Sequence, residues 1–255
     1  MILVLGGTAD GRIAAEQLAD KKQDTLYSSV SGYYQPRSAG PLTLHTGAMD
    51  LPALTAFMKQ KAITLCVDAT HPYAKTASEN AMAASKAAGI RYIRLERPGM
   101  AAAHQTGEVL GFPDYDAAVQ YLKNHPGNIL TTTGSRELEH YSVLDKKRLY
   151  LRVLPTSGVL KKCEALGYKP NRIIAVQGPF SVALNRAMMA AWAIRYVTTK
   201  DSGDLGGVKE KIEAAQQCGA RVICIERPKL DYPEVCETPG ALIERLKINE
   251  ETQDE

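Results

Sequence analysis

The segment GIRYIRLERP at residues 89–98 recurs as GARVICIERP at residues 219–228, an offset of 130 residues (from 89 to 219). At the same offset, CVDAT at 66–70 aligns with YVTTK at 196–200 without a gap. Self-similarity at a fixed distance along a chain is typical of a duplicated structural unit. The sequence therefore predicts two similar halves.

Each half opens on a strand-like run that ends in glycine. Residues 2–5 lead into Gly6 and Gly7, and residues 128–133 lead into Gly134. Later apolar runs alternate with segments of helical character, such as the alanine-rich stretch 74–88. Such alternation is typical of parallel strands joined by crossover helices. We therefore predict an α/β protein of two Rossmann-like domains with parallel sheets and an active site in the interdomain cleft.

This pattern divides the chain into four parts. Residues 1–100 are predicted to form an N-terminal Rossmann-like dinucleotide-binding domain, and residues 101–127 a connecting segment. Residues 128–248 are predicted to form a C-terminal Rossmann-like substrate domain, and residues 249–255 an acidic tail.

Composition narrows the class of protein. The formal net charge is +3 and there is no lysine-rich block, so nucleic acid is not an expected partner. No pair among the five cysteines has the C-x-x-C spacing, which predicts reduced thiols and neither a disulfide scaffold nor a metal site. No apolar stretch is long enough to cross a bilayer, and the N-terminal run lacks a basic leader. We expect a cytoplasmic protein without a membrane partner, either a monomer or a small homo-oligomer.

The first loop, GGTADGR at residues 6–12, has the features of a phosphate-binding turn. Glycines let the backbone approach a phosphate closely, and the start of the following helix offers unpaired N–H groups and a positive dipole end. We assign Gly6, Gly7 and Thr8 to the pyrophosphate of a dinucleotide. The order GGxxxG is not the usual fingerprint, and a plain strand–helix turn is the alternative.

The end of the second strand bears on the choice of dinucleotide. Proteins selective for NAD usually place a carboxylate there to hold the ribose 2′-hydroxyl. Here residues 27–32 read YSSVSG, and Arg37 follows. A hydroxyl from Ser29 and the cation of Arg37 suit a 2′-phosphate, so we expect NADPH as the cofactor, with NADH as the alternative.

The polar segment DATHPY at residues 68–73 follows an apolar run. Its position at the end of a strand is where ligands bind in open α/β sheets. We assign Asp68, Thr70 and Pro72 to cofactor binding, Tyr73 to substrate binding and His71 to catalysis. For His71 the alternatives are contact with the nicotinamide, substrate binding, proton delivery and a purely structural role as a helix cap.

Two loops of the second half occupy the matching places. TTTGSR at 131–136 offers hydroxyls, backbone amides and a cation, which suit either a second phosphate or a substrate carboxylate. TKDSG at 199–203 offers a cation and a carboxylate, or a capping turn for the next helix. The residues assigned from these loops to substrate binding are Thr133, Gly134, Ser135, Lys200 and Ser202. Lys200 and Asp201 are also assigned to catalysis.

Taken together, these segments resemble a known family. GGTADGR, DATHPYA, GIRYIRLERP, GPF at 178–180 with Asn185, and TKDSG resemble the precorrin-6A reductase family in their order and spacing, from about residue 1 to residue 245. The resemblance implies reduction of one double bond of a tetrapyrrole corrin precursor in cobalamin biosynthesis. It also implies a nicotinamide donor and a substrate with or without cobalt. The source of the proton stays open among His71, water and the substrate.

Two other classes of protein remain as alternatives. A non-enzymatic NADP-binding sensor would keep the Gly6–Gly7 turn without needing the polar cluster at 200–202. A double-Rossmann glycosyl- or nucleotidyl-transferase would bind a nucleotide in its C-terminal half through a different loop.

Overall fold

The computed structural model describes residues 1–30, 34–99, 109–201 and 207–248. The chain forms two compact units. Unit 1 combines residues 1–98 with the C-terminal segment from residue 229, and unit 2 comprises residues 99–228.

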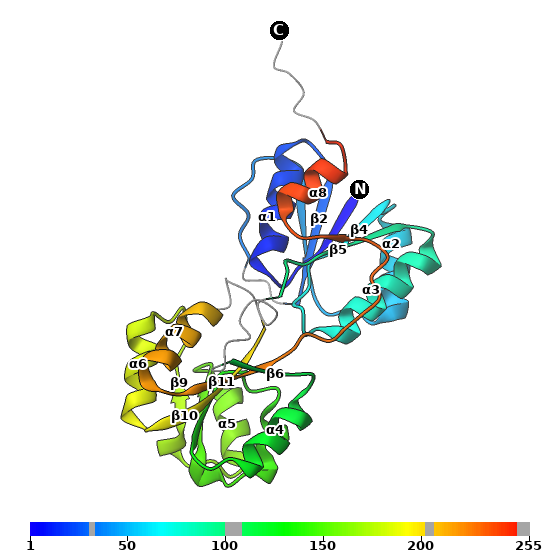
Figure 1. Ribbon diagram of the computed structural model, residues 1–255. Coiled ribbons are helices and arrows are strands. Elements are labelled where there is room, and N and C mark those ends of the chain that lie inside the picture. Colours follow the sequence, from blue (N-terminus) through cyan, green and yellow to red (C-terminus); the bar gives the residue numbers. More distant parts are fainter. Residues whose placement is uncertain (31–33, 100–108, 202–206, 249–255) are drawn as a thin grey trace. The chain divides into compact units, whose positions relative to one another are not determined.

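Unit 1 is built on a six-stranded sheet in the order β12-β5-β4-β1-β2-β3, with all neighbouring strands parallel (Figure 1). Its strands are β1 (Ile2–Leu5), β2 (Thr25–Ser29), β3 (Leu42–Thr46), β4 (Leu65–Asp68), β5 (Arg91–Leu95) and β12 (Val235–Cys236). The central strands β1 and β4 are buried at every residue, as strands covered on both faces must be.

Helices cover both faces of this sheet. Helix α1 (Ala9–Asp20) packs with α8 (Pro239–Arg245) on one face, and α2 (Leu51–Gln60) packs with α3 (Lys75–Ala88) on the other. Strand residues alternate between the two cores, so Val4 lies in the core under α1 while Leu3 lies in the core under α2 and α3. The apolar strands of the sequence are thus explained by burial from two sides.

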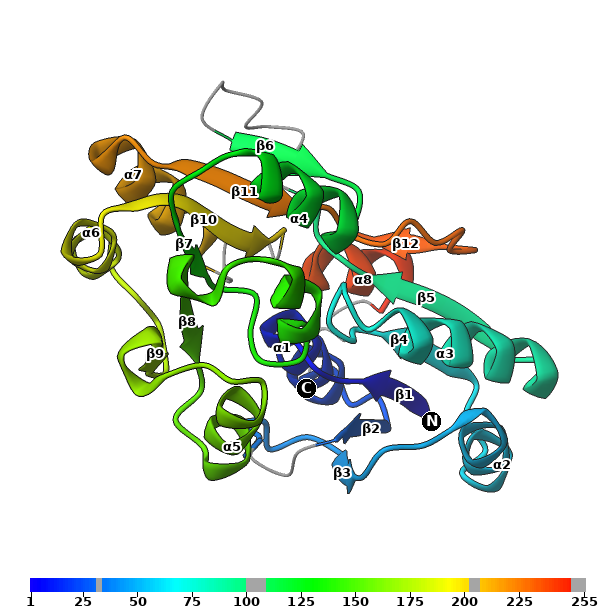
Figure 2. The same ribbon diagram turned by 90° about the horizontal axis from the view of Figure 1, so that it is seen from below.

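Unit 2 repeats this arrangement with the order β6-β11-β10-β7-β8-β9, again parallel throughout (Figure 2). Its strands are β6 (Val109–Phe112), β7 (Asn128–Thr131), β8 (Leu149–Val153), β9 (Ile173–Ala175), β10 (Ile194–Lys200) and β11 (Arg221–Ile225). Two parallel sheets with flanking helices confirm the predicted α/β fold of two Rossmann-like domains. The predicted position of the active site in a cleft between them stays a prediction.

The helices of unit 2 also divide between two faces. Helices α6 (Val182–Ala191) and α7 (Val208–Cys218) pack together over one face. On the other, α4 (Tyr115–Asn124) packs against the first 3-10 helix, η1 (Leu138–Val143). The remaining helical segments are α5 (Ser157–Ala165), η2 (Lys146–Arg148) and η3 (Pro170–Arg172).

The sixth strand of each sheet comes from an unexpected part of the chain. Strand β6 follows β5 in sequence but lies at the edge of the second sheet, where it pairs with β11. Strand β12 follows β11 but lies at the edge of the first sheet, where it pairs with β5. Each sheet is therefore completed by the strand that would continue the other.

This exchange corrects the predicted domain limits. Residues 101–127 are more than a connecting segment, because β6 and α4 lie within them and belong to unit 2. The stretch 128–248 does not form one domain, because the chain from residue 229 returns to unit 1 and buries Cys236, Leu242 and Ile243 in its core. The predicted acidic tail at 249–255 lies outside the described residues.

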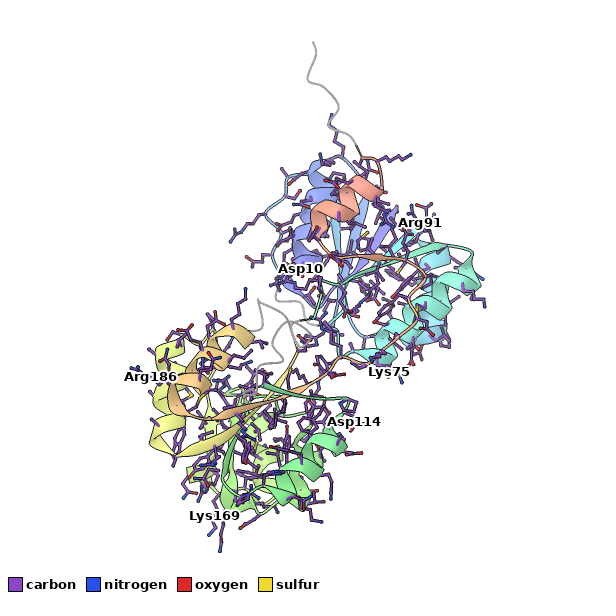
Figure 3. All side chains as sticks on the ribbon, viewed as in Figure 1. Asp10, Lys75, Arg91, Asp114, Lys169 and Arg186 are labelled. Atoms are coloured by element: carbon purple, nitrogen blue, oxygen red, sulfur yellow. The ribbon has the colours of Figure 1, made fainter. Side chains whose placement is uncertain are left out.

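Ion pairs fasten the returning segment. Glu234, just before β12, accepts hydrogen bonds from Arg91 Nε (3.0 Å) and Nη2 (2.7 Å) on β5, and from Arg245 Nη1 (2.9 Å) on α8. Arg91 is labelled on unit 1 in Figure 3. These hydrogen bonds lower the pKa of Glu234, Arg91 contributing most. These hydrogen bonds therefore hold the returning segment to the edge of the sheet of unit 1.

All five cysteines are free thiols. Among the described residues, no helix combines the length and apolar character needed to cross a membrane. Within the same part of the chain, no three metal-ligating side chains gather into a group.

Replacing Leu242 by Ala tests the role of the returning segment. Leu242 is fully buried against α1, so the cavity should destabilise unit 1 by about 2–5 kcal/mol in denaturant unfolding. Val143→Ala is the control, because Val143 is 64% exposed and its loss should cost under about 0.5 kcal/mol. Equal stability of the two variants would contradict the assignment of α8 to the core of unit 1.

Candidate functional site

The glycine loop of unit 1 lies at the carboxyl end of β1. A Cβ at Gly6 would stand 2.1 Å from Tyr27 Cζ, so only glycine allows the Tyr27 ring to lie there. Gly7 has φ +152°, and a Cβ there would stand 3.2 Å from the backbone nitrogen of His71. Both glycines therefore let the loop approach Tyr27 on one side and the segment at 70–71 on the other closely.

Thr8 begins helix α1 as its N-cap. Its Oγ1 accepts a hydrogen bond from the Gly11 backbone nitrogen (3.1 Å) and donates one to the Ala69 carbonyl oxygen (3.0 Å). A Cβ at Gly11 would approach Ala69 Cβ to 2.7 Å, so this glycine brings α1 close to the end of β4. The Thr8 hydroxyl therefore holds the helix start in place, and its predicted contact with phosphate stays a prediction.

Asp10 places a negative charge in the first turn of α1, and Arg97 compensates this charge. Its Oδ2 accepts a hydrogen bond from Arg97 Nε (2.8 Å) and forms an ion pair with Arg97 Nη2. Figure 3 shows Asp10 at this end of unit 1. Because Arg97 offsets the carboxylate, the helix N-terminus keeps its positive character toward an anionic ligand.

A cavity of about 460 Å³ lies beside α1. It is lined by Ala9, Arg12, Ile13, Glu16, Tyr34, Gln35 and Arg37. Glu16 Oε1 accepts hydrogen bonds from the Tyr34 hydroxyl (2.7 Å) and from the backbone nitrogen of Arg37 (2.9 Å). Arg12 and the predicted 2′-phosphate ligand Arg37 thus line one cavity. Ser29, the other residue assigned to that phosphate, is half-buried at the end of β2 and is not among the residues that line this cavity.

Asp68 belongs to a buried polar network. Its Oδ1 accepts hydrogen bonds from the Thr70 backbone nitrogen (3.0 Å) and hydroxyl (2.7 Å) and pairs with Arg94 Nη1 (2.9 Å). Its Oδ2 accepts from the Tyr92 hydroxyl (2.7 Å). Arg94, itself fully buried, also binds Glu96 Oε2 through Nε (2.6 Å).

This network gives Asp68 and Thr70 a structural role in the loop after β4. Asp68 is 0% exposed and Thr70 is 9% exposed. Burial opposes the charge of Arg94, but Asp68 and Glu96 outweigh burial and raise its pKa. Direct cofactor contact by Asp68 and Thr70 stays a prediction that this packing does not favour.

The rest of the segment is more accessible. His71 is exposed, its Nδ1 accepts a hydrogen bond from the Tyr73 backbone nitrogen (3.3 Å), and the two rings lie 5.7 Å apart. Pro72 and Tyr73 are half-buried, and helix α3 begins three residues after Pro72, at Lys75. These side chains lie at the same edge of the sheet as the glycine loop, as predicted for a ligand-binding edge.

In unit 2, part of the loop after β7 is buried in the protein interior. Thr133 is buried and its hydroxyl lies 3.2 Å from the Tyr141 hydroxyl, which donates to Thr198 Oγ1 (3.0 Å). Gly134 has φ +86°, a conformation that favours glycine. Gly134 and Ser135 are half-buried and remain candidates for contact with substrate.

Lys200 is the last residue of β10 and Asp201 follows it, and both side chains have polar partners. Lys200 Nζ lies 3.2 Å from Glu137 Oε1 and faces the Tyr115 ring at 5.9 Å. Asp201 is 3% exposed, its carbonyl accepts a hydrogen bond from Arg227 Nε (2.8 Å), and its Oδ1 lies 3.8 Å from Arg227 Nη2. Ser202, assigned to substrate binding, lies outside the described residues.

A cavity of about 630 Å³ lies in unit 2. It is lined by Thr132, Gly134, Arg152, Val153, Leu154, Val176, Gly178, Pro179, Phe180, Gly207, Glu210 and Lys211. Among these, only Gly134 was assigned from the sequence. Arg152 and Lys211 were missed, although each is a cation inside an apolar pattern. Arg152 lies in the buried strand LYLRV, and Lys211 shares a helix face with Val208 and Ile212.

Comparison with known proteins identifies relatives across the chain. Residues 1–247 match the family model described as precorrin-6x reductase CbiJ/CobK. A cobalt-precorrin-6A reductase from Priestia megaterium is 33% identical, over 96% of this chain and 98% of the relative. A second, from Methanococcus maripaludis, is 36% identical over the same shares. A precorrin-6A reductase from Rhodobacter capsulatus is 30% identical over 93% of this chain and 92% of its own.

A solved structure shows the same fold. It is described as CobK precorrin-6A reductase, and it superposes with a TM-score of 0.77 at 27% identity. The alignment covers 96% of this chain and 95% of that one. The likeness therefore includes both units.

Asp68→Asn tests the structural role of the buried network. Loss of the carboxylate charge leaves Arg94 with Glu96 alone, so the free energy of unfolding should fall by about 3 kcal/mol or more. Asp116→Asn is the control, because that side chain is 88% exposed and its surface pair should contribute under about 1 kcal/mol. A stability as high as that of the wild type would show that Asp68 does not support the fold.

Lys211 should make stability depend on pH. Burial, and secondly the charge of Arg152, lower the pKa of Lys211 from 10.5 to about 8. Between these two values the unfolded chain holds a proton that the folded chain has released, so raising the pH favours the folded state. Relative to Lys211→Met, the wild type should gain on the order of 3 kcal/mol from pH 8 to 10.5 in denaturant unfolding. A constant difference between the two proteins across that range would contradict the lowered pKa.

Proposed function

We infer that this chain, which belongs to the precorrin-6x reductase CbiJ/CobK family, reduces one carbon–carbon double bond of precorrin-6A or its cobalt form. The observation that carries this proposal is the extent of the family match, which runs through both units from residue 1 to residue 247. The chain is thus an oxidoreductase of cobalamin biosynthesis. The sensor alternative finds no support, because the relatives named above are all reductases.

The reaction requires a hydride and a proton. A reduced nicotinamide supplies the hydride to one carbon of the double bond, and a proton reaches the other carbon. His71 is exposed at the ligand-binding edge of unit 1, which suits proton delivery, with water and the substrate itself as the other sources. We propose Lys200 and Asp201 as the groups of unit 2 that act on the reacting part of the substrate.

The residues of unit 1 fit a dinucleotide. Gly6 and Gly7 let the loop pack closely against its neighbours, and Thr8 caps the start of α1. The N-terminus of that helix favours an anion. We therefore propose that this loop holds the pyrophosphate, as a modified form of the usual glycine turn. Pro72, like the backbone of Asp68 and Thr70, would border the same ligand.

We propose NADPH in preference to NADH. The support is the cavity beside α1, which both Arg12 and Arg37 line. Its carboxylate, Glu16, accepts hydrogen bonds from the Tyr34 hydroxyl and the Arg37 backbone nitrogen. Two guanidinium groups suit a 2′-phosphate, which accepts charge-assisted hydrogen bonds.

The substrate is a flat polycarboxylate, and we propose that unit 2 binds most of it. The residues assigned to this task are Thr133, Gly134, Ser135, Lys200 and Ser202, with Tyr73 from unit 1. The free thiols of all five cysteines fit a reducing compartment, and we propose the cytoplasm as the location.

An anaerobic assay tests the function. Purified protein is given cobalt-precorrin-6A or metal-free precorrin-6A, each with NADPH or NADH. The measurements are loss of reduced-nicotinamide absorbance and a gain of two hydrogens in the mass of the macrocycle. Turnover in any pairing supports the reductase and identifies its preferred donor and metallation state. Binding of the dinucleotide without turnover in all four pairings would overturn it.

Arg37→Ala tests the choice of dinucleotide. Loss of the guanidinium should raise KM for NADPH about tenfold and leave KM for NADH unchanged, because only NADPH carries the 2′-phosphate. Lys86→Ala, an exposed cation on α3, is the control and should change neither value. An equal loss for both donors would remove the 2′-phosphate assignment.

A further inference from the structure

The cavity of about 630 Å³ in unit 2 is built around a buried arginine. Arg152 is the second-last residue of β8 and is 6% exposed. Its Nη1 donates a hydrogen bond to Asn185 Oδ1 (2.7 Å), and its guanidinium carbon lies 4.0 Å from the centre of the Phe180 ring. Within residues 1–30, 34–99, 109–201 and 207–248, no carboxylate lies within ion-pair distance of Arg152.

A buried cation without an anionic neighbour is costly. Burial lowers the pKa of Arg152 to about 10, because the protein interior solvates the charged form poorly. Buried charges in proteins are normally paired, so the fold retains here a cost that an anionic ligand would offset.

Lys211 adds a second cation to the same wall. It lies on α7, is 6% exposed, and donates a hydrogen bond to Thr199 Oγ1 (3.1 Å). Electrostatic repulsion from Arg152 adds to the effect of burial in lowering the pKa of Lys211. Glu210 also lines the cavity, so the described charged groups comprise two cations and one carboxylate. The described lining is therefore net positive.

The remaining walls are apolar. Val153, Leu154, Val176, Pro179 and Phe180 line the cavity, and Leu154 is 53% exposed although it is a large hydrophobic residue. Apolar surface next to a buried cation suits a ligand that carries a carboxylate on a hydrocarbon frame. A nucleotide phosphate would instead be expected on backbone amides with little apolar surface around them.

We propose that this cavity is a subsite for a carboxylate-bearing side chain of the macrocycle, with Arg152 as its anchor and Lys211 as its second cation. The proposal rests on the reductase function, because it takes its ligand from the substrate of that reaction. Thr132 and Gly134 border the same cavity, so the subsite adjoins the loop already assigned to substrate binding.

Equilibrium binding tests the subsite without requiring turnover. Cobalt-precorrin-6A is titrated anaerobically, without dinucleotide, into the wild type, Arg152→Gln and Lys211→Gln, and the change in macrocycle absorbance gives Kd. NADPH is titrated separately into the same proteins. Arg186→Gln is the matched control. Arg186, labelled in Figure 3, is exposed on α6 and next in sequence to Asn185. It is not among the residues that line the cavity.

Arg152→Gln should weaken macrocycle binding about 10- to 100-fold, the range for a lost charge-assisted hydrogen bond, and leave NADPH binding unchanged. Lys211→Gln should weaken it in the same direction. With the carboxylates of the macrocycle converted to methyl esters, the wild type and Arg152→Gln should bind it equally. Weaker NADPH binding with unchanged macrocycle binding would overturn the proposal and assign the cavity to a phosphate. Unchanged binding of both ligands would overturn it as well.

Thermal unfolding separates binding from folding. Arg152→Gln removes an uncompensated buried charge, so its Tm without ligand should equal or exceed that of the wild type. A large drop in Tm would assign Arg152 a structural role and overturn the proposal. If the wild type binds the macrocycle but does not reduce it, the reductase function fails while this binding comparison remains decisive for the subsite.

Discussion

Completion of each sheet by a strand from the other half of the chain is the constraint on which this fold depends. A parallel sheet exposes hydrogen-bonding groups at its edge, and here β6 and β12 cover those edges. Because β12 returns with α8, the core over α1 closes only when the last part of the chain is in place. The ends of β1 and β4, which present the glycine loop and the Asp68 segment, are therefore held by residues from both ends of the sequence.

The two units use the ends of their strands differently. In unit 1, Arg94 of β5 is paired with two carboxylates, Asp68 at the end of β4 and Glu96 just after β5, and this network supports the loop that follows β4. In unit 2, Arg152 at the end of β8 has no such carboxylate among the described residues. The paired network of unit 1 makes a rigid support, which suits the proposed dinucleotide site. The cation Arg152 of unit 2 suits the anionic ligand proposed for that unit.

The sequence predicted the fold well and the site only in part. The repeat of GIRYIRLERP at 219–228 identified both halves, and these segments form β5 and β11 at matching places. The exchange of β6 and β12 between the sheets could not be predicted from the sequence, because the local pattern of a short edge strand does not indicate which sheet it joins. The buried network of Asp68 and Thr70 could not be predicted, because a polar cluster after a strand has the same sequence pattern whether it faces a ligand or a buried arginine such as Arg94. Arg152 and Lys211 become a pair only when β8 and α7 are brought together in space.

Amide hydrogen exchange, measured with each ligand alone, would test most directly the proposal that unit 1 binds the dinucleotide and unit 2 binds the substrate carboxylate. Under the proposed arrangement, NADPH slows exchange at residues 6–12 and 34–37 of unit 1, and the macrocycle slows it at residues 152–154 and 176–180 of unit 2. Slowing at 152–154 by NADPH, with residues 6–12 unaffected, would contradict the assignment of the dinucleotide to unit 1 and of the substrate carboxylate to unit 2.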